Sequence, residues 1–355
     1  MGFQEKNFIE IDGSYGEGGG QILRTALALS AILGKPIRVD RIRAGRKNPG
    51  LQPQHQEAVE ALARITEAQA EGIKPGSRRI TFFPKKILSG DYRFGVRTAG
   101  SLTLLLQAIL LPLCAAVGAS RVILSGGTHV PWSPPFHYLS QVLLPTLRGF
   151  GVSSEVTLEK WGFYPRGGGT VHLKVNPVHH FEPISLVDRG SLRRIGGLSA
   201  ISNLPKHVAE RQRDEALKRI QGEFGMDCEM KIFYDVPSSG PGSFLFLLAE
   251  FEGVLAGFSS LGARGKPAER VADEAVDSMK DYMMSDGCVD PHLADQLVPF
   301  MALAQGDSFF TTTRITEHLL TNLWVVQHFM KRKISVEGEK GERGRIGFVN
   351  EGRIF

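Results

Sequence analysis

The chain has 355 residues, of which 42% are hydrophobic, and it carries 42 Lys and Arg against 37 Asp and Glu, a formal net charge of +5. This length and composition exclude a disordered chain and predict two or three domains at roughly 150 residues each. The three cysteines, an odd number without a CxxC pair, argue against a disulfide framework or a zinc ribbon, so we expect a cytoplasmic protein.

The sequence indicates no membrane partner. Its longest apolar run, residues 101–118, contains Gln107 and Pro112 and therefore predicts a buried helix. Residues 1–13 are too polar for a signal peptide. The basic balance is compatible with an anionic partner such as nucleic acid or a nucleotide.

Three segments share one plan, in which a helix ends near a glycine and is followed by a strand, a loop, a second helix and further strands. In the first unit we predict helices over 21–33 and 55–65 and strands over 37–42 and 79–83. In the second we predict helices over 102–117 and from 136, and strands over 121–124, 155–159 and 170–175. In the third we predict helices over 294–304 and from 318, and strands over 309–312, 333–336 and 345–349.

A different pattern separates the second unit from the third. It consists of a strand at 195–202, a helix at 207–224, strands from 228 to 260 and a helix at 268–284. We predict that residues 185–284 form a small inserted α/β domain, and that residues 1–184 and 285–355 form the body. The expected fold class is α/β (α+β), with three repeated units of helix-covered sheet in approximate threefold symmetry.

The motif GSYGEGGGQILR, residues 13–24, leads a glycine run into a helix. Backbone N–H groups and the positive end of a helix favour an anion there, although a tight turn that needs glycine is the simpler interpretation. Glu17 inside such a loop would repel a phosphate unless a divalent cation lay between them.

A basic loop follows the first predicted strand of the first unit. It contains Arg41, Arg43, Arg46 and Lys47, which would suit either a solvated edge loop or an anion site. If Arg43 and Arg46 converge with Arg24, they would form a pocket for a terminal phosphate monoester.

Most of the ten histidines are expected to be structural. His318 differs because it follows a strand and opens a helix, whose positive end would keep the imidazole neutral and attract phosphate. His292 to Gln296 is typical of a polar helix start, which needs no further role than capping. Gln21, Gln107 and Gln296 fall at or near the first helix of their units.

Eight blocks of this sequence resemble, in order, those of the RNA 3′-terminal phosphate cyclases. They are DGSYGEGGGQILR, IRAGRKNPGLQPQH, GDYRFGVRTAGS, SGGTHVPWSPP, GFYPRGGGTV, LPKHVAER, HLADQLV and EHLLTN. The family's pattern has a basic residue or histidine before GxxPxGGGxV, where this chain has Trp161.

The resemblance implies that ATP adenylylates His318, that AMP passes to an RNA 3′-terminal phosphate, and that the 2′-OH then closes a 2′,3′-cyclic phosphodiester. It further implies a divalent metal, Mg²⁺ or Mn²⁺, on Glu17. Arg24, Arg43 and Arg46 would hold the RNA phosphate. The residues implied for the nucleotide are Gln107, Pro131, His292, Leu293, Ala294, Asp295 and Gln296.

Two other classes share features of this sequence. One is a non-catalytic relative that serves in ribosome assembly and binds RNA, but such proteins lack the nucleophilic histidine. The other is a small-molecule transferase that resembles the enolpyruvyl transferases, which would not need a histidine at a helix start within a nucleotide pocket. The presence of His318 favours the cyclase.

Overall fold

This computed structural model describes residues 8–96 and 99–349. Local capping groups set the boundaries of several of its helices. Gly34 ends its helix in the left-handed conformation, with φ 64°. Asp290 and Thr316 each accept hydrogen bonds from backbone N–H groups in the first turn of the helix that follows. Residues 1–7 of the polar N-terminal segment, 97–98 of the GDYRFGVRTAGS block and 350–355 lie outside the described residues.

Three four-stranded sheets share one strand order, in which the first two strands are parallel and the last two join in antiparallel pairing. The first unit contains β1 (Ile9–Asp12), α1 (Gly20–Leu33), β2 (Ile37–Asp40), α2 (Pro53–Ile65), β3 (Gln69–Glu71) and β4 (Ile80–Phe83). The second contains β5 (Asp91–Gly95), α3 (Leu102–Cys114), β6 (Ser120–Gly126), the helical turns α4 (Phe136–Tyr138), η1 (Leu139–Leu143), α5 (Leu144–Leu147) and η2 (Arg148–Phe150), β7 (Ser154–Lys160) and β8 (Gly169–Val175). The third contains β9 (Ser185–Leu186), α8 (Pro291–Leu303), β14 (Ser308–Thr312), α9 (Glu317–Phe329), β15 (Lys333–Glu337) and β16 (Gly344–Val349).

The predicted class, mixed α/β with several sheets covered by helices, is confirmed. Each unit opens with a strand that the sequence analysis missed, because β1, β5 and β9 are short segments of 4, 5 and 2 residues at the edges of their sheets. The threefold symmetry stays a prediction, and the shared strand order supports it.

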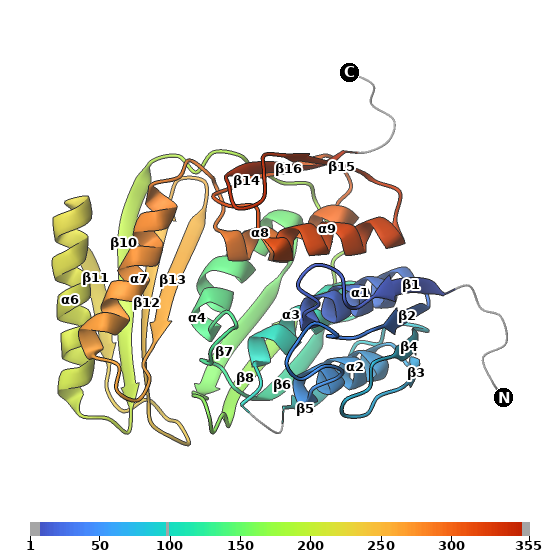
Figure 1. Ribbon diagram of the computed structural model, residues 1–355, viewed down its shortest axis with the longest axis horizontal. Coiled ribbons are helices and arrows are strands. Elements are labelled where there is room, and N and C mark those ends of the chain that lie inside the picture. The colour runs from blue at the N-terminus through green and yellow to red at the C-terminus, as the bar shows by residue number, and fades with distance from the viewer. Residues whose placement is uncertain (1–7, 97–98, 350–355) are drawn as a thin grey trace.

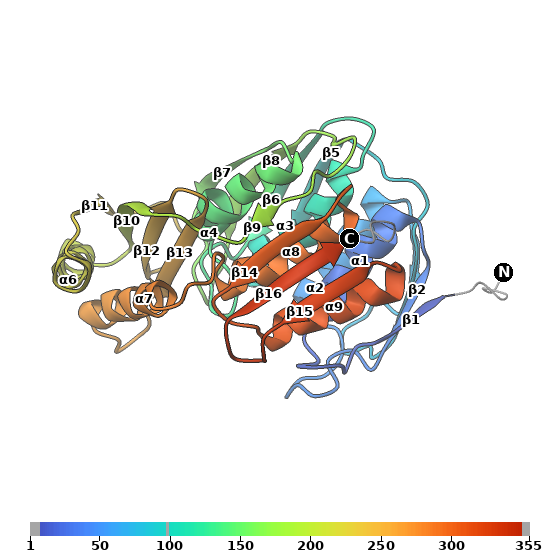
Figure 2. The ribbon, with the colours of Figure 1, turned by 90° about the horizontal axis from the view of Figure 1, so that it is seen from above.

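A fourth sheet lies at one end of the molecule (Figures 1 and 2). It contains β10 (Leu192–Ser202), β11 (Cys228–Phe233), β12 (Gly242–Phe251) and β13 (Leu255–Leu261), and it packs against α6 (Lys206–Phe224) and α7 (Ala268–Met283). The chain leaves the third sheet after β9 and returns to it through α8. The division into body and insert stays a prediction, which this topology supports with a departure point just after Leu186.

The helices of the body pack against one another between its sheets. Helix α1 contacts α2, α3 and α9, and α8 contacts α3 and α9 (Figure 1). This packing brings together the starts of α1, α8 and α9, which come from two different units. Among residues 8–96 and 99–349, no helix combines the length and the apolar character needed to span a bilayer.

Trp161, the departure from the family's pattern, lies where the body meets the insert. Its indole stacks on the His129 ring with centroids 4.2 Å apart, and Phe244 of β12 contacts the same imidazole. His129 Nε2 is 2.9 Å from Nδ1 of His137. Burial lowers the pKa of His129 well below its usual value and that of His137 to about 4. A neutral histidine pair thus offers Trp161 an aromatic surface, and a basic side chain there would lie beside no counter-charge from this pair.

Arg332 fixes the end of α8 relative to α9. Its Nη1 donates to the carbonyl oxygens of Met301, Ala302 and Ala304 at 3.0, 3.0 and 2.7 Å, and its Nη2 donates to that of Gly306. The last carbonyls of a helix lack donors from a following turn, and a cation at this end also offsets the helix dipole.

We expect Arg332→Met to lower the free energy of unfolding by about 3 kcal/mol, because several carbonyls lose a charged donor at once. Urea denaturation measures the change. Lys331→Met, at the exposed neighbouring position, is the control and should stay within about 0.5 kcal/mol of the unsubstituted protein. Equal effects of the two substitutions would contradict the assigned role of Arg332.

Candidate active site

His318 is held at the start of α9 by one glutamine from α1. His318 Nδ1 is hydrogen-bonded to Oε1 of Gln21, and the Gln21 amide nitrogen donates to Asp295 Oδ2 at 2.9 Å and to the His318 carbonyl oxygen at 3.0 Å. Since both amide hydrogens are engaged, Oε1 must accept from His318, which places the imidazole proton on Nδ1. The lone pair of Nε2 is therefore free.

The electrostatic surroundings keep this imidazole neutral. Burial lowers the pKa of His318, the Glu17 carboxylate opposes that change, and the positive charge of Arg24 adds to it. Nε2 lies 3.3 Å from Glu17 Oε2, and the His318 side chain is 47% exposed. A neutral, accessible nitrogen at a helix N-terminus is suited to attack phosphorus, as the sequence analysis expected for His318.

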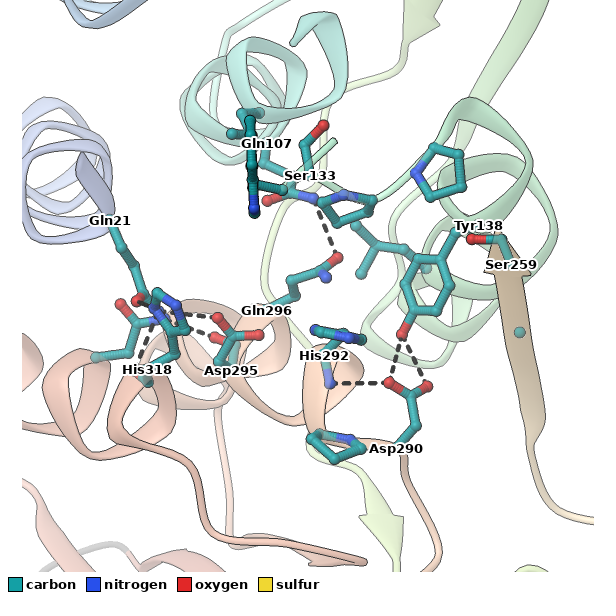
Figure 3. Close-up of a pocket in the computed structure, with 18 of the residues that line it drawn as sticks. Gln21, Gln107, Ser133, Tyr138, Ser259, Asp290, His292, Asp295, Gln296 and His318 are labelled. Carbon is teal, nitrogen blue, oxygen red and sulfur yellow. Dashed lines mark hydrogen bonds between the residues drawn. The ribbon is translucent and has the colours of Figure 1, made fainter. Parts of the chain in front are cut away.

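A cavity of about 910 Å³ extends from His318 to the insert. Figure 3 shows Gln21 and His318 at one end, Tyr138 and Ser259 at the other, and Gln107, Gln296 and His292 between them. This volume is within the range of ligand pockets. Of the residues predicted for a nucleotide, those that line it are Gln107, Pro131, His292, Asp295 and Gln296.

Two predicted nucleotide residues do not line this cavity. Leu293 and Ala294 are both fully buried in the core, where they anchor the first turn of α8. The next two residues, Asp295 and Gln296, line the cavity. The Gln107 side chain donates a hydrogen bond to Gln296 Oε1 at 3.1 Å. The helical period thus separates core residues from cavity residues within one motif.

Arg24 and Asp295 both line the cavity and lie close enough to interact electrostatically. Burial raises the pKa of Asp295 to about 8, although the positive charge of Arg24 opposes this rise. Burial also lowers the pKa of Arg24 to about 10. A carboxyl group that is largely protonated near neutral pH leaves Arg24 without a full counter-charge, so Arg24 is available to a further anion.

Two of the predicted phosphate-binding arginines, Arg24 and Arg43, act on His55. Burial, together with Arg24 and Arg43, lowers the pKa of His55 to about 3, so the imidazole is neutral. Its Nδ1 accepts from the Gln52 backbone N–H at 3.2 Å, which leaves Nε2 as a donor. A donor flanked by two guanidinium groups favours an anion, and the sequence analysis did not select His55 for this role.

Arg43 and Arg46 have different partners. Arg43 donates to the carbonyl oxygens of Asn48 and Gly50, so it shapes its own loop. Arg46 Nη2 lies 2.8 Å from Glu17 Oε2, the same oxygen that approaches His318. Arg46 therefore reaches the reactive histidine through Glu17, whereas Arg43 is committed to backbone groups.

Glu17 is the one predicted metal ligand. In the parts of the chain that the structure describes, no group of three or more His, Cys, Asp or Glu side chains could hold a metal ion. Mg²⁺ is commonly bound by one or two carboxylates together with substrate phosphates, so a single carboxylate beside His318 fits a metal that arrives with a phosphate.

Sequence reasoning missed three contributors to the site. Gln21 was noticed only for its position, and Asn322, which accepts from Thr25 and donates to the Asp295 carbonyl, was not considered. The insert contributes residues of β13 and α7, including Ser259 and Tyr282, to the cavity wall. The spacing of Asn322 four residues after His318 on one helix face is a signal that could have found it.

Together these features define a class: an α/β protein in which a nucleotide-sized cavity ends at a neutral histidine beside clustered arginines. A sequence profile described as RNA 3′-terminal phosphate cyclase matches residues 15–336. The proteins named RNA 3′-terminal phosphate cyclase in Staphylothermus marinus, Thermococcus onnurineus and Methanopyrus kandleri are 47%, 45% and 43% identical to this chain. The alignments cover 95%, 97% and 98% of this chain and 97%, 99% and 100% of those proteins. The chain belongs to the RNA 3′-terminal phosphate cyclase family and is an enzyme.

The raised pKa of Asp295 predicts a pH-dependent stability. Between about pH 4 and pH 8 the folded protein binds this proton and the unfolded chain does not, so the free energy of unfolding falls as pH rises. Asp295→Asn removes this dependence. The free energy of unfolding of the variant relative to the unsubstituted protein should therefore rise across this window, by at most about 1.4 kcal/mol per pH unit.

Urea denaturation of both proteins measures this difference. The measurements run from about pH 4.5 to about pH 8.5, which spans most of the range in which the Asp295 proton is bound only in the folded protein. A difference that stays constant with pH would mean that Asp295 is ionised throughout, as an exposed aspartate is.

Proposed function

We propose that this chain uses ATP to convert an RNA 3′-terminal phosphate into a 2′,3′-cyclic phosphodiester through a covalent His318–AMP intermediate. The observation that carries the proposal is the free Nε2 of a neutral His318, fixed by Gln21 at the end of the cavity. Family membership and the names of the relatives support the overall reaction.

The proposed reaction has three displacements. His318 Nε2 attacks the α-phosphorus of ATP, a phosphorus–nitrogen bond forms, and pyrophosphate leaves. An oxygen of the RNA 3′-phosphate then attacks the same phosphorus and restores His318. The 2′-OH finally attacks the activated 3′-phosphorus, loses its proton, and expels AMP. Proximity of the 2′-OH supplies much of the last step.

The cavity residues have separate tasks in this scheme. The nucleoside would lie along Gln107, Pro131, His292 and Gln296, which line the middle of the cavity. The first turn of α9 would direct backbone N–H groups towards the phosphates. Because Gln21 accepts from Nδ1–H, the positive charge that forms on the imidazole would stay hydrogen-bonded.

The clustered basic groups would bind the phosphates. Arg24 and His55 lie beside Gly20 and Arg46 lies beside Gly19, so all three would donate to a phosphate near this turn, and Arg43 would act by holding the loop that carries Arg46. Glu17 would hold a divalent metal, Mg²⁺ or Mn²⁺, which supplies charge neutralisation at the phosphates when bound. The three cysteines are free thiols, which supports a reducing compartment such as the cytoplasm.

His318→Ala should abolish transfer of label from α-labelled ATP to the protein, because no other group replaces the nucleophile. His207→Ala is the matched control, since His207 is likewise the second residue of a helix and exposed, but lies on the insert. The expected result is no label on the first variant and normal label on the second. Full labelling of His318→Ala would disprove the assignment, and an unlabelled unsubstituted protein would favour the RNA-binding relative without catalysis.

Gln21→Met should slow self-adenylylation by about 10- to 100-fold, because the imidazole loses the partner that fixes its proton on Nδ1. The measurement is the single-turnover rate with saturating ATP. The loss should fall on that rate rather than on the ATP concentration that gives half the maximal rate. A change confined to ATP affinity would make Gln21 a nucleotide contact and not a positioning residue.

A further inference from the structure

An aromatic pair joins the glycine loop to α9, the helix that carries His318, and takes no part in the scheme above. The rings of Tyr15, in the glycine loop, and Trp324, on α9, stack with centroids 4.1 Å apart and planes inclined by 6°. His328 packs its ring edge against the indole, with centroids 4.3 Å apart. Tyr15 is 40% exposed although one face of its ring covers Trp324, so the other face is open to solvent.

The glycine loop holds Tyr15 in a fixed position relative to Glu17. Gly16, between them, has φ 54°, and a Cβ there would lie 2.5 Å from Thr321 Oγ1 and 2.8 Å from Glu317 Oε1. The loop therefore lies directly on α9, and only glycine permits this approach. Tyr15 and Glu17 flank Gly16 in the sequence. The tyrosine is therefore only two residues from Glu17, whose carboxylate contacts His318.

This aromatic pair lies outside the lining of the nucleotide cavity, on the flank of the site where the glycine loop meets α9. Neither Tyr15 nor Trp324 lines that cavity. The charged groups near it are cationic as well as anionic: Arg46 contacts Glu17, and Lys340 contacts Glu317 with a side chain that is 62% exposed. A polyanion that enters from this flank would meet Arg46 and Lys340 before it reaches His318.

Resting on the function proposed above, we propose that Tyr15 and Trp324 form a stacking platform for the base next to the 3′-terminal nucleotide of single-stranded RNA. When AMP fills the cavity, an RNA chain whose terminal phosphate is at Arg24 and Arg46 would leave along this flank. Unpaired bases near an RNA end stack on exposed aromatic faces, and every base has such a face. The platform therefore selects unpaired ends without selecting sequence.

The alternative is that Tyr15 only fastens the glycine loop to α9. A fastening contact needs apolar surface and not an open aromatic face, so two substitutions separate the roles. Tyr15→Leu keeps an apolar contact with Trp324 and removes the face, whereas Tyr15→Phe keeps both. Tyr234→Leu, at a tyrosine on the insert that is also 40% exposed, is the matched control.

The test compares two oligoribonucleotides that end in a 3′-phosphate and differ only by an abasic residue at the second position from that end. The unsubstituted protein should cyclise the intact oligonucleotide with a KM about tenfold lower, within the range of one stacked base. Tyr15→Leu should bring the two KM values within about twofold of each other. Tyr15→Phe and Tyr234→Leu should keep the full preference.

Self-adenylylation of each protein with α-labelled ATP distinguishes the possible failures. An active protein that shows no preference for the intact oligonucleotide, or a preference that survives in Tyr15→Leu, overturns the platform alone. Loss of adenylylation in Tyr15→Leu also overturns it, since the ring would then serve the ATP step. An unsubstituted protein that neither adenylylates itself nor cyclises either oligonucleotide overturns the proposed function, and the platform with it.

Discussion

The amide of Gln21 joins the starts of three helices and so determines the geometry of the whole site. From α1 it reaches His318 on α9 and Asp295 on α8, and no free hydrogen is left on its nitrogen. The imidazole tautomer follows from this arrangement, as does the burial of the Asp295 carboxyl against Arg24. Because α1 belongs to the first unit and α8 and α9 to the third, these hydrogen bonds form only when both units are packed together.

The ionisable groups around this amide are arranged for an anion that is not part of the protein. Burial pushes Asp295 towards its protonated form and keeps His55 neutral, which reduces negative charge and leaves donors from Arg24 and His55 without a full counter-charge. A phosphate would supply that charge. The same surroundings favour an unprotonated His318, so a phosphate site here would leave the proposed nucleophile active.

Local patterns in the sequence predicted what depends on neighbouring residues. The helix predicted from His318, which starts at Glu317, the left-handed Gly34 and the helices and strands of the insert follow from capping, turn chemistry and periodicity. The contact between Gln21 and His318 joins residues 297 positions apart, and nothing local marks it. Likewise, the sequence does not distinguish Arg43 from Arg46, because both lie in one basic loop. In the folded loop Arg43 donates to two carbonyl oxygens, whereas Arg46 pairs with a carboxylate. The cavity wall from the insert depends on how two sheets pack, which periodicity does not specify.

The geometry of displacement at phosphorus also constrains the order of the proposed reaction. In a phosphoryl-type displacement the attacking and leaving groups lie roughly in line, so pyrophosphate would leave from the side of the α-phosphorus opposite Nε2. The RNA phosphate must then attack from that same side, because Nε2 is now the leaving group. Arg24 and Arg46 would therefore hold pyrophosphate first and the RNA phosphate second. One anion pocket used twice requires the first product to leave before RNA binds, which is ping-pong kinetics.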